Sequence, residues 1–209
     1  PVRERRGLTP WIGLGVLLVA LWTYLRMMSP TVPFWDAGEF ISVSKILGVP
    51  HPPGTPFYVL LGRMATLVPL GNIAQRVNGL SAVSSALAVL LTYLTTLRLI
   101  RIAQRGGAGA GTAAPVWGSE ALAQTGAVVA ALMLAFSRTF WENATGAETY
   151  SEMSLAQVLI LWLGLRWWEA HDRRPTVGPL LVAVYVMWLS VGLMLGVGMM
   201  GLPLMVLLW

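Results

Sequence analysis

Long apolar runs constrain this chain more than any other feature of its sequence. Runs of about 17 to 25 residues recur along it, and a helix of that length crosses about 30 Å of hydrocarbon at about 1.5 Å per residue. The clearest lie at residues 11–27, 77–97, 121–136 and 153–168, while residues 177–209 can form two shorter ones broken near residues 196–201. We therefore predict an all-α, polytopic transmembrane helix bundle of about five or six spans.

The composition excludes an ordinary soluble domain. Hydrophobic residues make up 56% of the sequence and charged residues only 11%, against about one quarter charged in soluble domains. We read the net charge of +5 as a signal of membrane topology and expect no nucleic-acid partner. The chain has no cysteine, which excludes disulfides and thiolate metal ligands. We treat residues 1–209 as a single transmembrane domain and expect it to be the N-terminal part of a longer protein.

The arginines predict the orientation, because short loops rich in Lys and Arg stay on the cytoplasmic side of a membrane. They gather in three clusters at the ends of apolar runs: Arg3, Arg5 and Arg6; Arg98, Arg101 and Arg105; and Arg166, Arg173 and Arg174. This pattern predicts a cytoplasmic N-terminus and puts residues 30–76 and 137–152 on the extracytoplasmic face. Those two segments hold five of the nine acids: Asp36, Glu39, Glu142, Glu148 and Glu152. The acids either form a site together or reflect only the scarcity of arginine in outer loops.

The first outer segment, residues 30–76, has the character of a site. Asp36 and Glu39 are three residues apart, which on a helix places both carboxylates on one face, and the apolar pattern over residues 40–47 predicts an interfacial helix. Trp35 suits the headgroup level of a bilayer. A carboxylate at that depth is costly unless it is paired, hydrogen-bonded or used, so Asp36 is a functional candidate.

A proline-rich turn follows at residues 50–56 and presents His51. Each residue before a proline is held in an extended conformation, with Gly54 as the one permissive point. His51 either donates a hydrogen bond to a phosphate or hydroxyl, or belongs to a simple connector. Residues 57–70 then form a run that is short for a span and predicts a re-entrant or interfacial helix. On it, Arg63 pairs with Asp36 or Glu39, binds a lipid phosphate, or extends to the interface as an unpaired cation.

Several patches of the sequence resemble a known family. The first is Pro-Phe-Trp-Asp-Ala-Gly-Glu-Phe at residues 33–40, continued by Leu-Gly-Val-Pro-His-Pro-Pro-Gly-Thr-Pro at residues 47–56 and Arg-Val-Asn at residues 76–78. Weaker patches lie at residues 143–155 and 192–203. Together they resemble a bacterial membrane family long known as a domain of unknown function and related to protein O-mannosyltransferase-like proteins, within the glycosyltransferase-C superfamily.

This resemblance implies an inverting membrane glycosyltransferase. Such an enzyme takes a sugar from a polyprenyl-phosphate carrier and passes it to an acceptor hydroxyl, on a protein or a glycan, at the extracytoplasmic face. The family's acid in the first outer loop corresponds to Asp36, which would remove the acceptor proton as the general base. The lipid-linked sugar is then the donor substrate, and we predict that no cofactor or metal is required.

The resemblance also suggests partners for Asp36. Glu39 would orient the base or bind the sugar, His51 and Arg63 would balance the charge of the departing lipid phosphate, and Glu148 with Tyr150 would form the opposite wall. We predict a multi-pass protein of the bacterial inner membrane.

Two rival functions remain open. This sequence has Gly198 where the resemblance leads us to expect a histidine, which suits a non-catalytic, transferase-like subunit of a larger membrane complex. A transporter or lipid-binding protein could use the same outer cleft.

Overall fold

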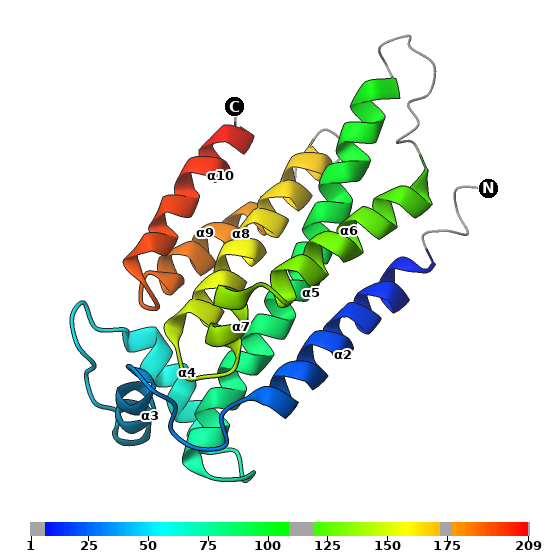
Figure 1. Cartoon of the computed structure of the whole chain (residues 1–209). Coiled ribbons are helices and arrows are strands. Elements are labelled where there is room, and N and C mark those ends of the chain that lie inside the picture. The colour runs from blue at the N-terminus through cyan, green and yellow to red at the C-terminus, as the bar shows by residue number, and fades with distance from the viewer. Residues whose placement is uncertain (1–6, 109–118, 172–176, 209) are drawn as a thin grey trace.

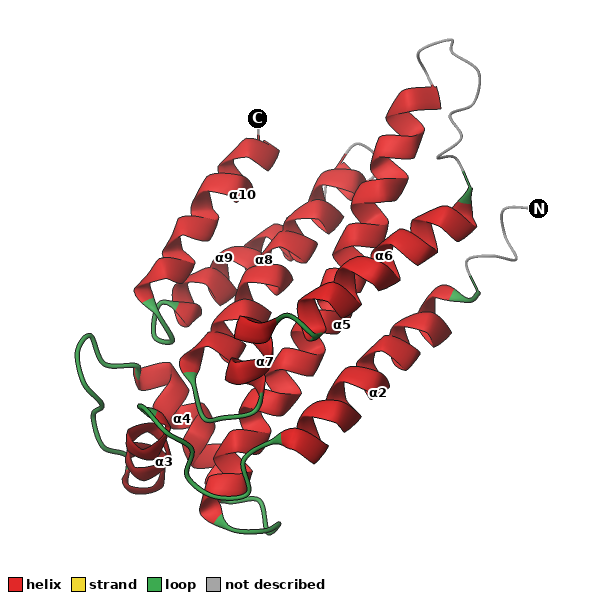
Figure 2. Ribbon diagram, in the orientation of Figure 1, coloured by secondary structure: helices red, strands yellow, loops and turns green. Residues whose placement is uncertain are grey.

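The computed structural model describes residues 7–108, 119–171 and 177–208. In this part of the chain every regular element is helical, and no strand occurs (Figure 2). The all-α prediction is therefore confirmed. Five arginines of the predicted topology clusters lie outside the described residues: Arg3, Arg5, Arg6, Arg173 and Arg174.

One long helix, α5, organises the others around it (Figure 1). In chain order the elements are α2 (Thr9–Met27), α3 (Ala37–Ile46), α4 (Pro56–Thr66), α5 (Ile73–Ala108), α6 (Glu120–Ala135), α7 (Arg138–Ala144), α8 (Thr149–His171), α9 (Gly178–Ser190), the 3-10 helix η2 (Leu195–Met200) and α10 (Gly201–Leu208). Helices α2, α6 and α8 pack against α5, and α9 packs against α8. The short helices α3 and α4 lie together beside the first turns of α5.

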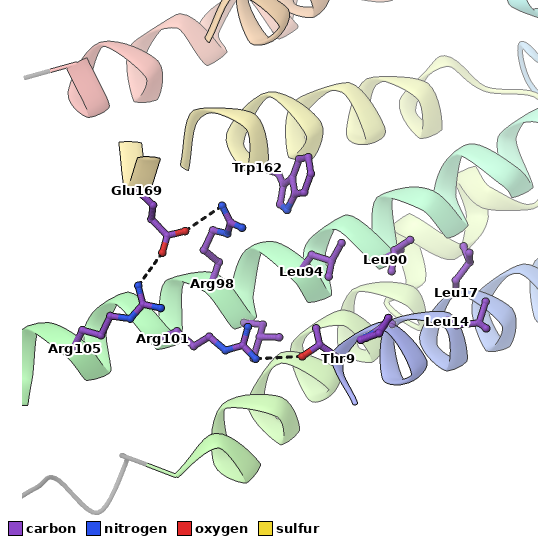
Figure 3. Close-up of a pocket in the computed structure, with 13 residues that line it drawn as sticks. Thr9, Leu14, Leu17, Leu90, Leu94, Arg98, Arg101, Arg105, Trp162 and Glu169 are labelled. Carbon is purple, nitrogen blue, oxygen red and sulfur yellow. Dashed lines mark hydrogen bonds and ion pairs between the residues drawn. The ribbon is translucent and has the colours of Figure 1, made fainter. Parts of the chain in front are cut away.

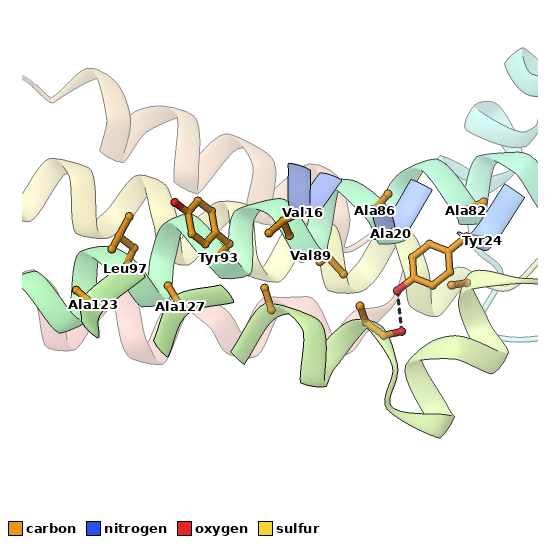
Figure 4. Close-up of a cluster of buried hydrophobic side chains, with 13 residues drawn as sticks. Val16, Ala20, Tyr24, Ala82, Ala86, Val89, Tyr93, Leu97, Ala123 and Ala127 are labelled. Atoms are coloured by element: carbon orange, nitrogen blue, oxygen red, sulfur yellow. Dashed lines mark hydrogen bonds between the residues drawn. The ribbon is translucent and has the colours of Figure 1, made fainter. Parts of the chain in front are cut away.

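Small side chains let α2, α5 and α6 approach one another closely. Their shared core is rich in buried alanine, and two tyrosines fill its larger spaces (Figure 4). Alanine at a helix crossing brings the backbones near enough for dispersion contacts along the whole interface. The hydroxyl of Tyr24, which is fully buried, donates to the carbonyl oxygen of Ala135 at 2.9 Å and so satisfies a carbonyl at the C-terminal end of α6.

The predicted number of five or six spans is not confirmed. Among the described residues, two helices are long and apolar enough to cross a membrane, Thr9–Met27 and Ile73–Arg105, and the pair α6 and α7, bent by 65°, can supply a third. Helix α9 has 13 residues, or about 20 Å at 1.5 Å per residue, which is short of a bilayer core. The break expected at residues 196–201 comes earlier, between Ser190 and Leu195. Pro203 does not kink a span, because it lies in the first turn of α10, where proline is tolerated.

Both short helices predicted in the first outer segment are present. Phe40 of α3 packs edge-on against Tyr58 of α4, with ring centroids 5.0 Å apart. The amphipathic pattern of α3 is only partly as predicted: Phe40, like its neighbours Ile41 and Val43, is buried, whereas Ile46 is 74% exposed. Ile46 lies on the opposite side of the helix from Ala37 and Phe40 at about 3.6 residues per turn, and Leu47 then ends the helix in the left-handed conformation.

Candidate functional site

Asp36 occupies the N-cap position of α3, where an aspartate usually accepts a hydrogen bond from the first turn of the helix. Its side chain caps no backbone N–H, and the carboxylate is exposed. Among the described residues it forms no hydrogen bond or ion pair. The fold therefore makes no structural use of this carboxylate, although Asp36 is fixed at the start of a helix.

Beside it, Glu39 binds His51 through both oxygens. The backbone N–H of His51 donates to Glu39 Oε1 at 2.7 Å, and His51 Nδ1 lies 2.6 Å from Glu39 Oε2. The side-chain bond lowers the pKa of Glu39 below its usual value and raises the pKa of His51 above its own. The turn that presents His51 is thus tied to the first turn of α3, and its ring is biased toward the charged form.

The ligand-type atoms of Asp36, Glu39 and His51 all lie within 4.8 Å of one another. Two carboxylates and an imidazole are a donor set that suits a divalent cation such as zinc. A metal on Nδ1 would have to displace the Glu39 bond, however, so these residues already satisfy one another. That no metal is required stays a prediction.

Glu148 faces this group from the loop that precedes α8. Its pKa is raised to about 7, mainly by burial and also by the negative charge of Asp36, while His51 acts in the opposite direction. The loop is held by Ser81 of α5, whose hydroxyl lies 3.5 Å from the backbone N of Glu148. The side chain therefore exchanges a proton near neutral pH. Its position opposite Asp36 was expected from the sequence, but its raised pKa was not.

Two further polar side chains near Glu148 are buried, and neither of them was assigned a role in the site from the sequence. Glu152, in the first turn of α8, is 3% exposed, and neither carboxylate oxygen has a hydrogen-bond partner among the described residues. The hydroxyl of Tyr58, a fully buried residue, is likewise without a partner in this part of the chain. For Glu152 the sequence held two signals: its place among the five acids of the outer segments, and its spacing of four from Glu148, which favours a common face at a helix start.

Arg63 and Tyr150 do not join the cluster. The guanidinium of Arg63 donates to the carbonyl oxygen of Lys45 at 2.7 Å, at the C-terminal end of α3. It forms no ion pair with Asp36 or Glu39, contrary to one of the expectations, because free carbonyls at a helix end are a closer partner. Tyr150 is 45% exposed, and its hydroxyl bonds to no described residue. Their roles toward a substrate stay predictions.

The Arg-Val-Asn patch at residues 76–78 supports the loop rather than the chemistry. Arg76 donates to three carbonyl oxygens, those of Thr66, Leu70 and Gly71, at 2.8 to 3.0 Å. The amide of Asn78 donates to the carbonyl oxygens of Ser29 and Thr31 at 2.8 and 3.1 Å. The first turns of α5 thus hold the chain on both sides of the Asp36 segment.

Comparison with known proteins identifies a family whose matched region contains these residues. The family model described as the Protein O-mannosyl-transferase TMEM260 N-terminal domain matches residues 36–209. The chain belongs to this family. It is 35% identical over 141 residues to Protein O-mannosyl-transferase TMEM260 of Mus musculus, covering 67% of this chain and 17% of that protein. It is 25% identical over 155 residues to Protein O-mannosyl-transferase tmem260 of Dictyostelium discoideum, covering 72% of this chain and 16% of that protein. No solved structure matches the chain.

Membership of the TMEM260 family confirms the predicted kinship with protein O-mannosyltransferase-like proteins. The two relatives are eukaryotic, so a bacterial origin is not confirmed, and the glycosyltransferase-C superfamily stays a prediction. The matched region begins at Asp36 and includes every residue of the cluster. The chain spans about a sixth of the length of the relatives it matches.

Proposed function

We propose that this chain is the membrane part of a glycosyltransferase of the glycosyltransferase-C type, with Asp36 as its general base. The observation that carries the proposal is the carboxylate of Asp36, which sits at an N-cap without capping the helix and lies beside the paired Glu39 and His51. The names of the TMEM260 relatives support mannose as the sugar and a protein as the acceptor. The donor we propose is mannose on a polyprenyl phosphate.

In the proposed step, Asp36 takes the proton of the acceptor hydroxyl as its oxygen attacks the anomeric carbon. The bond from that carbon to the phosphate oxygen breaks, and the lipid phosphate leaves with the electron pair, so the configuration inverts. His51 supports departure of the phosphate, because its pairing with Glu39 favours the imidazolium and leaves Nε2–H as a donor. Such a donor stabilises charge that grows in the transition state.

Glu148 extends this mechanism. Its pKa of about 7 suits a group that takes a proton and passes it on near neutral pH. After the transfer it can accept the proton from Asp36, which lies close enough for the two charges to repel. Release of that proton from Glu148 to water then returns the site to its starting state on the same face of the membrane. We propose that this face is extracytoplasmic and that the N-terminus is cytoplasmic.

The second candidate is a non-catalytic subunit of a membrane complex, and Gly198 favours it. This glycine stands in η2 where a histidine was expected, and the nearest atom to an added Cβ is 4.0 Å away, so the fold does not demand glycine here. A subunit would keep the helices of a transferase without its activity.

The deciding experiment measures mannose transfer by the purified full-length protein. The donor is labelled polyprenyl-phosphate mannose, and a solubilised membrane extract serves as the pool of protein acceptors. We expect Asp36→Asn to lower kcat by roughly 100- to 10,000-fold with little change in KM. Glu142→Gln is the matched control, because Glu142 is an exposed acid that pairs with Arg138 of its own helix. Full activity of the Asp36 variant would refute its role, and an inactive wild type would favour the subunit.

A further inference from the structure

A cavity of about 740 Å³ is lined by residues of α2, α5 and α8 (Figure 3). It is a groove over α5 between α2 and α8. Ala74, beside the Asp36 segment, and Arg101, at the groove, are 27 residues apart on α5, or about 40 Å along the helix axis. That distance matches the thickness of a bilayer with its headgroup regions, about 40 to 45 Å. The groove therefore faces the opposite leaflet from the proposed transfer site.

One end of the groove is lined by arginines. Arg98 and Arg105 share a single carboxylate, that of Glu169, at 3.0 and 3.1 Å. Arg101 pairs with Glu120 and donates to the hydroxyl of Thr9.

Three arginines of the groove lining thus pair with two glutamates, which leaves an excess of positive charge. Arg166 does not line the groove, but its guanidinium lies nearby, 4.9 Å from the ring centre of Trp162. Because one carboxylate cannot saturate two guanidiniums, each with five donors, Arg98 and Arg105 keep N–H groups for a further anion.

The rest of the groove is apolar. Leu14 and Leu17 come from α2, Leu90 and Leu94 from α5, and the ring of Trp162 closes the α8 side. The leucines of α5 lie one to two turns along the helix from Arg98, so the charged and apolar parts follow one another along a single axis. A free phosphate would use only the arginine end. A phosphate joined to a long apolar chain would use both.

We propose that this groove binds one anionic phospholipid, with its phosphate on Arg98 and Arg105 and an acyl chain along the four leucines. The lipid would tie α2 to α8 across α5 at the leaflet opposite the transfer site. This site is independent of Asp36 and of the proposed sugar transfer, so the two proposals can fail separately.

The test measures lipids retained by the full-length protein in native mass spectrometry. Phosphatidylglycerol, phosphatidylcholine and inorganic phosphate are added in separate titrations. We expect phosphatidylglycerol to bind at least tenfold more tightly than phosphatidylcholine, and phosphate alone not to be retained. An arginine near a membrane surface changes the affinity for anionic lipid roughly fivefold, so the pair Arg98→Gln and Arg105→Gln should weaken phosphatidylglycerol binding by roughly 25-fold.

A second variant should change the lipid affinity in the opposite direction, and its result does not depend on whether the first variant folds. Glu169→Gln removes the carboxylate that Arg98 and Arg105 share, so it should tighten phosphatidylglycerol binding severalfold. If the ion pairs served only the fold, this variant would lower stability and leave lipid affinity unchanged. Arg138→Gln is the control, because Arg138 is exposed and lies at the other end of the bundle, paired with Glu142.

A photoreactive group in the acyl chain of phosphatidylglycerol locates the site. We expect the label on peptides that contain Leu14 and Leu17 or Leu90 and Leu94. Equal retention of the two phospholipids would overturn the proposal. A label confined to other helices would do the same, and would indicate that a segment of the full-length protein fills the groove.

Discussion

The contact between α3 and α4 offers a direct test of how the fold positions Asp36 and Glu39. A Cβ added at Gly62 of α4 would lie 2.1 Å from Oγ of Ser44 and 2.8 Å from its Cβ, while the Cα is 4.0 Å away. The hydroxyl can rotate aside, but Cβ of Ser44 is fixed by the backbone of α3. Gly62→Ala must therefore push the two helices apart, and overpacking of this kind costs about 1 to 3 kcal/mol.

Two double variants show whether Oγ or Cβ of Ser44 causes the clash with the Cβ added at Gly62. Its hydroxyl is buried and has no hydrogen-bond partner among the residues that the structure describes, so Ser44→Ala alone should be neutral or slightly stabilising. Combined with Gly62→Ala it should not rescue, because the clash with Cβ remains. Ser44→Gly costs about 0.5 kcal/mol in helix propensity, but it should restore most of what Gly62→Ala loses, because the nearest remaining atom is then 4.0 Å away.

The assay is the free energy of unfolding of the full-length protein in mixed micelles, titrated with denaturing detergent, together with mannose transfer. Gly62→Ala should lose stability and activity together, since α3 carries Asp36 at its N-cap. Gly79→Ala is the control, because no atom lies within 4 Å of its added Cβ. The reasoning fails if Gly62→Ala is as stable as the wild type, or if Ser44→Ala rescues it as well as Ser44→Gly does.

Three further predictions concern the cluster and its support. The pKa of Glu148 is raised from 4.5 to about 7, so between these pH values the folded state binds a proton that the unfolded state has lost. Stability should therefore fall as the pH rises from 4.5 to about 7. In Glu148→Gln the thermal midpoint should no longer depend on pH in this way. Glu39→Gln should lower the pKa of His51 toward its ordinary value, measured by NMR titration of the ring, because the bond that raises it is lost. Arg76→Met leaves three carbonyls without their donor and should cost about 1 to 3 kcal/mol of unfolding free energy, whereas Arg138→Gln, at an exposed pair, should change it little.

The positions of the helices followed from the sequence where apolar runs end at polar or proline-rich segments. Helix α2 begins two residues before the predicted run at residues 11–27 and ends where that run ends. Helix α5 begins at Ile73, four residues before the predicted run at residues 77–97. Its first turn is polar because Arg76 binds carbonyls of the preceding loop, and hydropathy cannot separate such a turn from the loop itself.

The candidate site was predicted as a set of residues but not as a set of contacts. The proline-rich turn was expected to fix His51, yet its pairing with Glu39 across 12 residues depends on how the loop closes. One of the three alternatives for Arg63 was an ion pair with the acids, but its guanidinium donates to a carbonyl at the end of α3 instead. The raised pKa of Glu148 arises from burial and from the charge of Asp36, which is distant in sequence. Each of these is a tertiary effect that spacing along the chain does not encode.

The most specific family-like patches divide into two kinds of residue once the contacts are known. Arg76 and Asn78 donate hydrogen bonds to backbone carbonyls that flank the Asp36 segment, so their part in the fold is enough to explain why these residue types stand there. Asp36 stays exposed at an N-cap that it does not cap. A charged group that is held in position by a rigid helix start and has no structural partner is the kind of residue that a reaction, rather than stability, retains. Substituting Arg76 should therefore lower stability and activity together, whereas Asp36→Asn should lower activity at unchanged stability.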